Sequence, residues 1–217
     1  PVDCDEYLAV FTEGGLSQTR EDIHAAFDAL IGRQCAFRLE TSLFNMPGRP
    51  GWYTPNRSFH KGFVAANTIG LCDKGYHAPR SRVEDTFFST SLTYLHEHHY
   101  AYEQWRNRLK FKVRNRVDPE DRAALEAYLQ IPDAESSHAV ACLLITEAEY
   151  GALYADDVRI FPSRCETGAV IVETPDLPPF LWDSEAYLAR NPDVRGYHTG
   201  PLQHYLQHGY EERRLLR

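Results

Sequence analysis

The chain has 217 residues, of which 43% are hydrophobic and 12% aromatic, and its formal net charge is -8. That apolar content suffices for the buried core of one domain with a small appendage, and it excludes a chain that is disordered over most of its length. The acidic balance argues against broad electrostatic binding to nucleic acid, and no apolar run approaches the roughly 20 residues of a membrane-spanning helix.

The first 34 residues are predicted to be helical. Thr19 is a typical N-cap, and acidic residues directly after it suit the positive end of the helix dipole. Apolar residues then recur at helical spacing as far as Gly32, which ends the helix. A short strand is predicted over residues 35–40.

The middle of the chain has a less regular pattern. Prolines and glycines interrupt residues 41–82, which predicts a long, ordered loop region with one short helix, and loops of that length are usually functional. A strand is predicted over residues 86–92, a helix over 94–105 and a second strand over 109–113. Six basic residues alternate between positions 106 and 116, so a strand would place them on one face, most simply a solvated one.

A helix is predicted over residues 118–129, with Asp118 as its cap before a proline at the first helical position. Three further strands are predicted over residues 138–145, 158–161 and 169–173. Gly168 precedes the last of them, which indicates a tight hairpin between residues 161 and 169.

Three prolines at positions 175, 178 and 179 mark a boundary. Residues 180–217 are too few to hold a core alone, so we expect two or three short helices that pack on the main domain or on a partner. The predicted fold is therefore α+β: a split, mostly antiparallel sheet with flanking helices over residues 1–176, and a small helical appendage over 177–217.

The most informative segment is Phe87-Phe88-Ser89-Thr90-Ser91. Alternation along a strand puts Phe87, Ser89 and Ser91 on one face and Phe88 and Thr90 on the other. Hydroxyl groups that project from one strand face can hydrogen-bond a ligand or a carboxylate beside it. The same pattern is also typical of an ordinary strand end.

Two other positions carry charge next to apolar segments. Arg38 lies in the middle of its strand, where a guanidinium needs a partner, either a phosphate-bearing ligand or an acid such as Glu40. Glu147 and Glu149 follow the apolar run 139–145, so we expect the two carboxylates to leave a strand on the same side.

In this order, these residues resemble the R-S-E class of ADP-ribosyltransferases. That family has an arginine on a first strand, a Ser-Thr-Ser motif on a second and a Glu-x-Glu or Gln-x-Glu motif on a later one. The matching residues here are Arg38, Ser89-Thr90-Ser91 and Glu147-Ala148-Glu149. Gly62-Phe63 resembles the family's Gly-Phe element, and the resemblance covers roughly residues 34–174.

The resemblance implies an enzyme that uses NAD as a substrate and transfers its ADP-ribose to an arginine-like or other nucleophilic acceptor. Glu149 would stabilise the oxocarbenium-like transition state, Ser89 would orient that carboxylate, and Glu147 would activate the acceptor. Glu166 and Glu173 are rival candidates for the catalytic acid, because the residues after Glu149 could continue a helix.

The resemblance also implies the residues that bind NAD. Arg38 would hold a phosphate of the dinucleotide, and Tyr53 or Phe63 could stack on the nicotinamide. The other residues of the expected binding site are Thr90, Ser91 and Gly62.

A metal-dependent enzyme is one alternative, because His96-Glu97-His98-His99 is dense in potential ligands. On the predicted helix, His96 and His99 are three residues apart and share a face, as would suit one ion. A polar, solvated helix face is the competing interpretation.

A second alternative is a non-catalytic docking domain of a sugar-modifying system. The last 38 residues resemble a repeat, Tyr-Leu-x-x-Asn-Pro-Asp-Val followed by His-Tyr-x-x-x-Gly, that is attached to bacterial glycosyltransferases and other enzymes. We expect its apolar residues to pack across the Asn191-Pro192 turn. These residues are Trp182, Tyr187, Leu188, Leu202, Tyr205 and Leu206.

The five cysteines are scattered and contain no Cys-x-x-Cys pair, which is typical neither of a disulfide framework nor of a structural zinc site. Reduced thiols are therefore expected. No signal peptide is visible, although the chain begins with Pro1. We expect a cytoplasmic protein, or an effector secreted without a visible signal.

Overall fold

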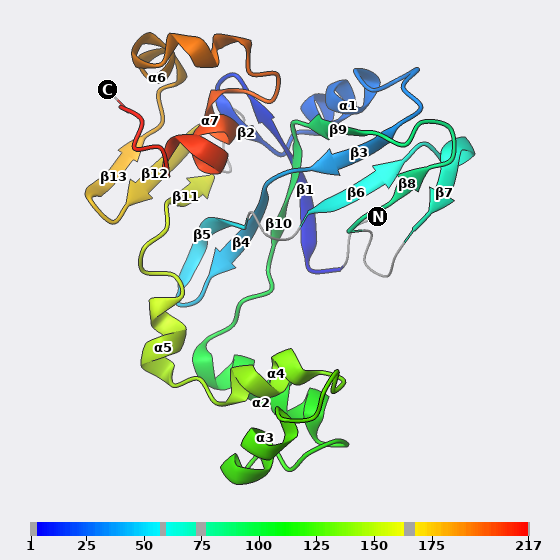
Figure 1. Cartoon of the computed structure of the whole chain (residues 1–217). Helices are drawn as coiled ribbons and strands as arrows, with labels where there is room; N and C mark the ends of the chain where they lie inside the picture. Colours follow the sequence, from blue (N-terminus) through cyan, green and yellow to red (C-terminus); the bar gives the residue numbers. More distant parts are fainter. Residues whose placement is uncertain (1–3, 57–59, 73–76, 163–167, 217) are drawn as a thin grey trace. The chain divides into compact units, whose positions relative to one another are not determined.

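A computed structural model describes residues 4–56, 60–72, 77–162 and 168–216 (Figure 1). The fold is of the predicted α+β class, with mostly antiparallel strands and flanking helices. The chain divides into two compact units, and this division does not follow the predicted boundary at residue 176. The first unit comprises Pro1–Asn45, Gly51–His98 and Asp157–Arg217, and the second comprises Met46–Pro50 and His99–Asp156.

Eight strands of the described chain form the larger sheet, in the order β13-β12-β11-β5-β4-β10-β1-β2. Strand β1 is antiparallel to β2 and β10, and β10 is parallel to β4. The strands are β1 Glu6–Thr12, β2 Gly15–Ser17, β4 Ser42–Met46, β5 Arg49–Asn56, β10 Leu92–His96, β11 Arg159–Pro162, β12 Val170–Thr174 and β13 Leu177–Leu181.

The hairpin β1–β2 shows that the helical prediction for the start of the chain was wrong. The two strands turn at Glu13 and Gly14, and Gly15, the first residue of β2, has a φ of 146° that favours glycine. A Cβ atom at Gly15 would lie 2.6 Å from the carbonyl oxygen of Gly168, so the close approach of the two chain segments also requires glycine. The predicted helix start at Thr19 is confirmed: its hydroxyl accepts a hydrogen bond from the amide of Asp22, and α1 spans Arg20–Asp28.

A second, three-stranded sheet has the order β6-β3-β9. Residues Ala36–Leu39 form strand β3, as predicted. This strand lies between β6 (Lys61–Val64) and β9 (Phe87–Thr90). It is antiparallel to β6 and parallel to β9. Helix α1 packs on one face of this sheet, where Phe27 meets Phe63 with ring centroids 5.6 Å apart.

Residues 41–82 are not the long loop that their composition predicts. They contain β4, β5 and β6, followed by the short 3-10 helix η1 (Ala66–Thr68) and the pair β7 (Ile69–Leu71) and β8 (Arg80–Ser81). Gly48 and Gly51, with φ of 73° and 79°, bend the β4–β5 segment. These glycines and the neighbouring prolines hide the alternation of the strands from a sequence pattern.

The predicted strand over residues 86–92 is two strands in two sheets. The chain bends at Ser91 between β9 and β10, and passes from the small sheet into the large one (Figure 1). Strand β10 continues to His96, so the helix predicted from residue 94 was wrong there. Leu92 and Tyr94 are buried in the core beneath the sheets, and this burial sets the strand.

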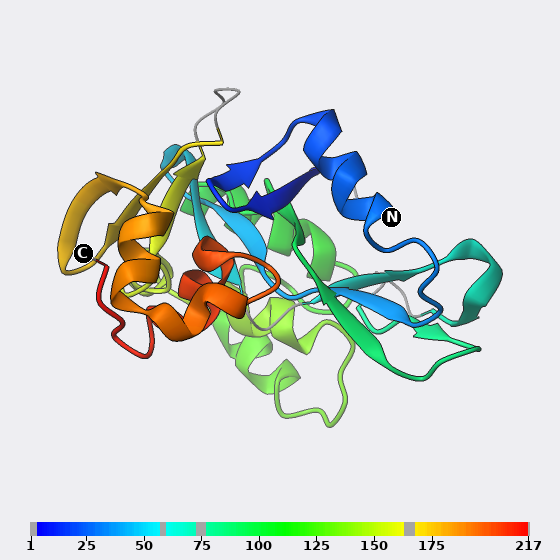
Figure 2. The same cartoon turned by 90° about the horizontal axis from the view of Figure 1, so that it is seen from above.

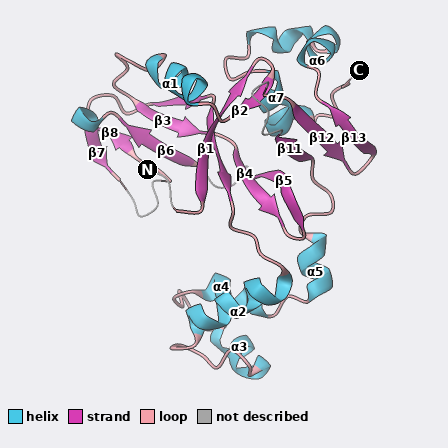
Figure 3. Ribbon diagram, turned by 180° about the vertical axis from the view of Figure 1, so that it is seen from behind, coloured by secondary structure: helices cyan, strands magenta, loops and turns pink. Residues whose placement is uncertain are grey.

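In the second unit, the segment His99–Asp156 is helical (Figure 3). Its helices are α2 Tyr102–Val113, α3 Arg122–Tyr128, α4 Ser137–Leu143 and α5 Glu147–Ala152. The strands predicted over residues 109–113 and 138–145 were therefore wrong: Val113, Val140 and Leu143 meet in one small helical core. Helix α3 is capped by Asp121 rather than Asp118.

The alternating basic residues lie on and just after α2, not on a strand face. A two-residue step on a helix turns by about 200°, so these side chains diverge. Lys110 pairs with Glu120 at 2.7 Å, and Arg116 pairs with Glu135. The guanidinium of Arg108 lies 4.2 Å from the centre of the Tyr100 ring.

The C-terminal segment packs into the core of the first unit, beside β11, β12 and β13 (Figure 2). Its elements are α6 Ser184–Arg190, η2 Pro192–Gly196, α7 Pro201–His204 and η3 Tyr205–Gly209. The predicted packing of Trp182 and Tyr187 on Tyr205 is confirmed, with ring centroids 5.4 and 5.6 Å apart. The amide of Asn191 donates to the carbonyl oxygen of Tyr187 at 2.9 Å, which closes the turn.

The predicted hairpin near residue 168 is confirmed by the antiparallel pairing of β11 with β12, while residues 163–167 lie outside the described part. The prolines at 178 and 179 are in β13, an edge strand whose register against β12 shifts, and edge strands with such irregularities tolerate proline. Among the described residues, no helix has the length and apolar character needed to cross a bilayer.

Candidate functional site

The small sheet brings three of the predicted site residues into one row. Arg38 on the central strand pairs with Gly62 of β6 on one side and with Ser89 of β9 on the other. Residues in register on neighbouring strands share a face. The opposite face carries Phe37 and Leu39, which are buried in the core.

Glu40, the residue directly after β3, joins this row. The hydroxyl of Ser89 donates a hydrogen bond to the carboxylate of Glu40. Arg38 Nη1 lies 3.9 Å from Glu40 Oε1, and His60 Nδ1 lies 3.8 Å from Glu40 Oε2. The side chains of Arg38 and Glu40 are 35% and 21% exposed, so the pair is accessible to a ligand.

Phe87 supplies an aromatic ring at the same place. The guanidinium of Arg38 lies 4.4 Å from the centre of the Phe87 ring, a cation–π arrangement, and Phe87 is 40% exposed. Its position two residues before Ser89 on one strand was the sequence signal that could have identified it. We call Arg38, Glu40, His60, Phe87 and Ser89 the Arg38 face.

Glu147 and Glu149 do not leave a strand, and that prediction was wrong. They lie in the first turn of α5, in the second unit, and both are exposed. Glu149 and Thr146 form a capping box, in which each side chain bonds the backbone of the other residue. Hydrogen bonds from the backbone amide and then the hydroxyl of Thr146 lower the pKa of Glu149. The Thr-x-x-Glu spacing was already a helix-start signal in the sequence.

The two rival candidates for the catalytic acid are Glu173 and Glu166. Glu173 lies in β12 of the large sheet and pairs with Arg159 at 2.8 Å, and both side chains are 14% exposed. Its carboxylate therefore has a structural partner. Glu166 lies outside the described residues.

The remaining predicted binding residues lie elsewhere. Phe63 stacks on Phe37 at a centroid distance of 5.0 Å, on the core side of the small sheet. Tyr53 is buried in β5 of the large sheet and donates a hydrogen bond to Glu97. Neither ring belongs to the Arg38 face.

Thr90 and Ser91 support the strands rather than the exposed row. The hydroxyl of Thr90 donates to the carbonyl oxygen of Arg38 at 3.1 Å, and Thr90 is buried. The carbonyl oxygen of Ser91 accepts a hydrogen bond from the amide of Phe11 at 2.8 Å. Ser91 also lines a cavity of about 600 Å³ with Tyr197 and other C-terminal residues.

The C-terminal segment approaches the Arg38 face at His198. His198 Nε2 lies 3.0 Å from the carbonyl oxygen of Ser89, and the His198 ring lies 5.7 Å from that of Phe88. His198 lines the same cavity as Ser91. The strand that carries Ser89 is thus held by residues more than 100 positions later in the chain.

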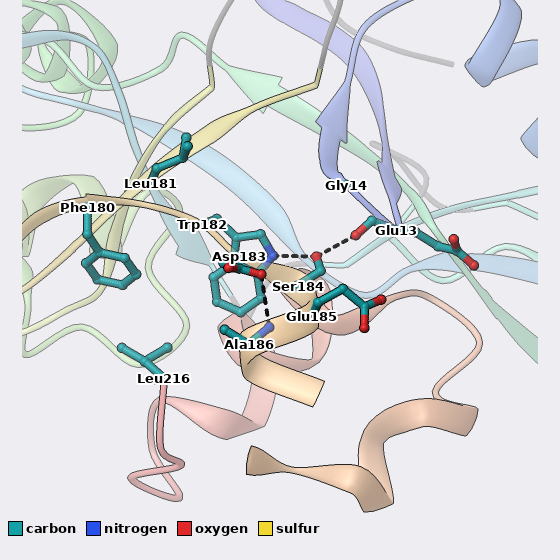
Figure 4. A pocket seen from close by; sticks show the side chains of 10 residues that line it. All are labelled: Glu13, Gly14, Phe180, Leu181, Trp182, Asp183, Ser184, Glu185, Ala186 and Leu216. Atoms are coloured by element: carbon teal, nitrogen blue, oxygen red, sulfur yellow. Dashed lines mark hydrogen bonds between the residues drawn. The ribbon is translucent and has the colours of Figure 1, made fainter. Parts of the chain in front are cut away.

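A larger cavity, of about 840 Å³, lies between the β1–β2 turn and the start of α6 (Figure 4). Its floor is tied by structural hydrogen bonds: the indole of Trp182 donates to the hydroxyl of Ser184 at 2.8 Å, and that hydroxyl donates to the carbonyl oxygen of Glu13. Asp183 caps α6 through the amide of Ala186. None of the predicted site residues lines this cavity.

The histidine cluster is arranged differently from the helical face that we predicted. His96 ends β10, whereas His99 lies in the second unit, with its ring 5.0 Å from that of Tyr154. The ring that lies beside His96 is that of His98, at 4.7 Å, and Asp5 approaches both. Burial, and then the charge of His98, lower the pKa of His96.

Four cysteines of the described chain, Cys4, Cys35, Cys72 and Cys142, are free thiols. Comparison of the whole chain with family models, with curated proteins and with solved structures found no match.

Proposed function

We propose that the chain binds NAD on the Arg38 face and transfers its ADP-ribosyl group to a nucleophilic acceptor. One observation carries the proposal: the hydroxyl of Ser89 is hydrogen-bonded to the carboxylate of Glu40 beside the guanidinium of Arg38. Arginine, serine and glutamate are the three residue types that the family resemblance requires. Here the glutamate is Glu40, directly after the strand of the arginine, and not a residue of Glu147-Ala148-Glu149.

The roles follow from charge and geometry. Arg38 offers a planar fork of donors that matches a phosphate group, and Phe87 behind it can stack on a ring of the dinucleotide. During transfer, the bond between ribose C1′ and nicotinamide breaks, and nicotinamide leaves with the bonding pair. The positive charge that develops on the ribose would lie next to the Glu40 carboxylate, which Ser89 holds in place.

The acceptor then forms the new bond to C1′ and loses a proton to the solvent. The acceptor is an arginine-like group or another nucleophile, as the sequence resemblance implies. Because NAD is an intracellular metabolite, the reaction belongs in a cytoplasm, either that of the producing cell or, for an effector, that of its target.

The test is nicotinamide release from NAD, measured with agmatine, with polyarginine and with water as acceptors. Removal of a group that stabilises transition-state charge typically costs about 100- to 1000-fold in rate, so we expect Glu40→Gln to lose at least about 100-fold. Ser89→Ala should lose less, and Arg38→Lys should mainly raise KM because it removes the planar fork. Glu126→Gln changes an exposed glutamate of α3 and is the control. It should release nicotinamide at the wild-type rate.

The variant Glu149→Gln tests whether Glu149 or Glu40 is the catalytic acid. Glutamine also serves at the third position of a capping box, so this variant should keep the fold of α5. If Glu149→Gln abolishes nicotinamide release while Glu40→Gln retains it, the site drawn here is wrong. If the wild-type chain neither releases nicotinamide nor shows a thermal shift with NAD, the function is wrong.

A further inference from the structure

We propose that Asp5, His96 and His98 form a binding site for a first-row transition-metal dication, separate from the Arg38 face. Each side chain offers one ligand atom, and these atoms all lie within 4.8 Å of one another. His96 Nε2 is 3.5 Å, and His98 Nδ1 3.8 Å, from Asp5 Oδ2. Ligands with bonds of about 2.1 Å to a tetrahedral ion lie roughly 3.4 Å apart, so only small side-chain movements would complete the site.

Two strands bring the three ligands together. Strand β1 begins at Glu6, directly opposite His96 at the end of β10. The amide of Glu97 donates to the carbonyl oxygen of Asp5 at 2.8 Å and extends the ladder by one residue. The carboxylate of Glu97 accepts a hydrogen bond from Tyr53, while His96 and His98 turn their rings toward each other.

A supporting shell surrounds His96. Its Nδ1 lies 3.8 Å from a carboxylate oxygen of Glu6, and Glu6 is held by the ammonium of Lys61 at 2.5 Å. Metal-binding histidines commonly direct their second ring nitrogen to a carboxylate, which fixes the orientation of the ring. The edge of Phe44 packs on His96 at a centroid distance of 4.8 Å and restricts the ring further.

The donor set selects the kind of metal. Two imidazoles and one carboxylate suit Zn²⁺, Fe²⁺ or Co²⁺, whereas Mg²⁺ and Ca²⁺ prefer oxygen ligands. Three protein ligands leave at least one coordination position for water or another molecule. The side chain of His98 is 56% exposed, so that position would face solvent.

The experiment uses the full chain without a histidine tag, freed of metal by dialysis against EDTA. Zn²⁺ is titrated against a chromophoric chelator, and Co²⁺ is added separately to follow its visible absorption. We expect one equivalent of either metal per chain. His98→Ala and Asp5→Asn should weaken binding by at least about tenfold, the lower end of the effect of losing even a supporting residue.

Two histidine variants are matched controls. His24→Ala removes an exposed histidine of α1, and His99→Ala removes the neighbour that a helix would have placed with His96. Both should bind Zn²⁺ as the wild type does. Zn²⁺ should also raise Tm for the wild type and for these controls but not for His98→Ala, because only binding to the folded state stabilises it.

Three results would overturn the site: binding well below one equivalent, a His98→Ala variant that binds as tightly as the wild type, or a loss of binding in His99→Ala. In those cases the cluster only joins the ends of β1 and β10 by ionic contacts. Metal content and Tm are measured without NAD, so failure of the proposed ADP-ribosyl transfer would leave this test unaffected.

Discussion

Lys61 is the most deeply buried cation in the described part of the first unit. Its side chain is 8% exposed, its ammonium donates to Glu6 at 2.5 Å, and the Glu6 side chain is completely buried. The ring of Tyr94 lies 5.4 Å from the same ammonium. Removal of one partner from such a pair leaves an uncompensated charge in a poorly solvated place.

We therefore expect Lys61→Met to destabilise the protein by about 3–5 kcal/mol, the range for breaking a buried ion pair. Urea unfolding followed by circular dichroism measures the change. The double variant Lys61→Met with Glu6→Leu should recover most of the loss, since it removes both charges. A single variant within about 1 kcal/mol of the wild type would mean that other groups compensate for the charge of Glu6.

The candidate acids illustrate what a residue pattern can and cannot predict. The sequence identified Arg38 and Ser89, because a charged or polar residue on a short strand stands out from its apolar neighbours. It named Glu40 only as an ion-pair partner, although the hydrogen bond from Ser89 makes it the acid of that face. The pairing of β3 with β9 joins residues about 50 positions apart, and no local spacing encodes that pairing.

At the scale of elements, the C-terminal segment was predicted best. Its packing partners are near in sequence, so the helical period and the Asn-Pro turn were enough to predict that Trp182 and Tyr187 meet Tyr205. Position 209 of this segment requires glycine, because a Cβ atom there would collide with the hydroxyl of Tyr187. Protein docking through residues 180–217 stays a prediction.

His204 gives this segment a pH dependence. Burial lowers the pKa of His204 from 6.5, and the nearby charges of Arg214 and His208 lower it further. The unfolded chain therefore binds a proton more readily than the folded one, so stability should fall as the pH drops below about 6.5. Asp193 and Glu212 oppose the shift but do not reverse it.

The measurement is urea unfolding at pH 8 and at pH 5.5 for the wild type and for His204→Gln. Glutamine cannot be protonated there, so the variant should lose less stability on acidification. The difference between the two proteins isolates His204 from His96, whose pKa is also lowered by burial. Equal losses in both proteins would contradict the assignment.

Some elements were predicted wrongly for a common reason. The run over residues 138–145 is short and apolar, and such a run fits a buried strand as well as a helix. Leu109 and Val113 alternate with lysines as in a strand, but they are also four residues apart, as on one helix face. Both segments are helical because Val113, Val140 and Leu143 contact one another in a helical core. Residues 94–96 extend β10 because β1 and β4 pair with them.

At the scale of the whole molecule, residues 177–217 belong to the core of the first unit rather than to an accessory module. Five large side chains of this segment are at most 6% exposed and pack in the same cluster as Phe11 and Ile160. They are Trp182, Tyr187, Leu202, Tyr205 and Leu206. At about 1.5–3 kcal/mol for each buried side chain, their contribution is on the order of 10 kcal/mol.

A chain that ends at residue 176 should therefore fail to fold, because total stability is typically about 5–15 kcal/mol. We expect the dispersed amide signals of the proton NMR spectrum and cooperative unfolding to be lost. Leu181→Ala, at a residue that is 65% exposed, is the control and should change little. A truncated chain that unfolds cooperatively would restore the view of an accessory module.

The sequence by itself determined the α+β class, the helix start at Thr19, the β11–β12 hairpin and the internal packing of the C-terminal segment. Each depends on residues that are close in the chain, where caps, turns and periods act directly. Only the tertiary structure decided that Glu40 faces Ser89 and that Asp5 meets His96 and His98. Those contacts depend on the pairing of distant strands. That pairing is selected by the area that the whole fold buries, and no short segment specifies it.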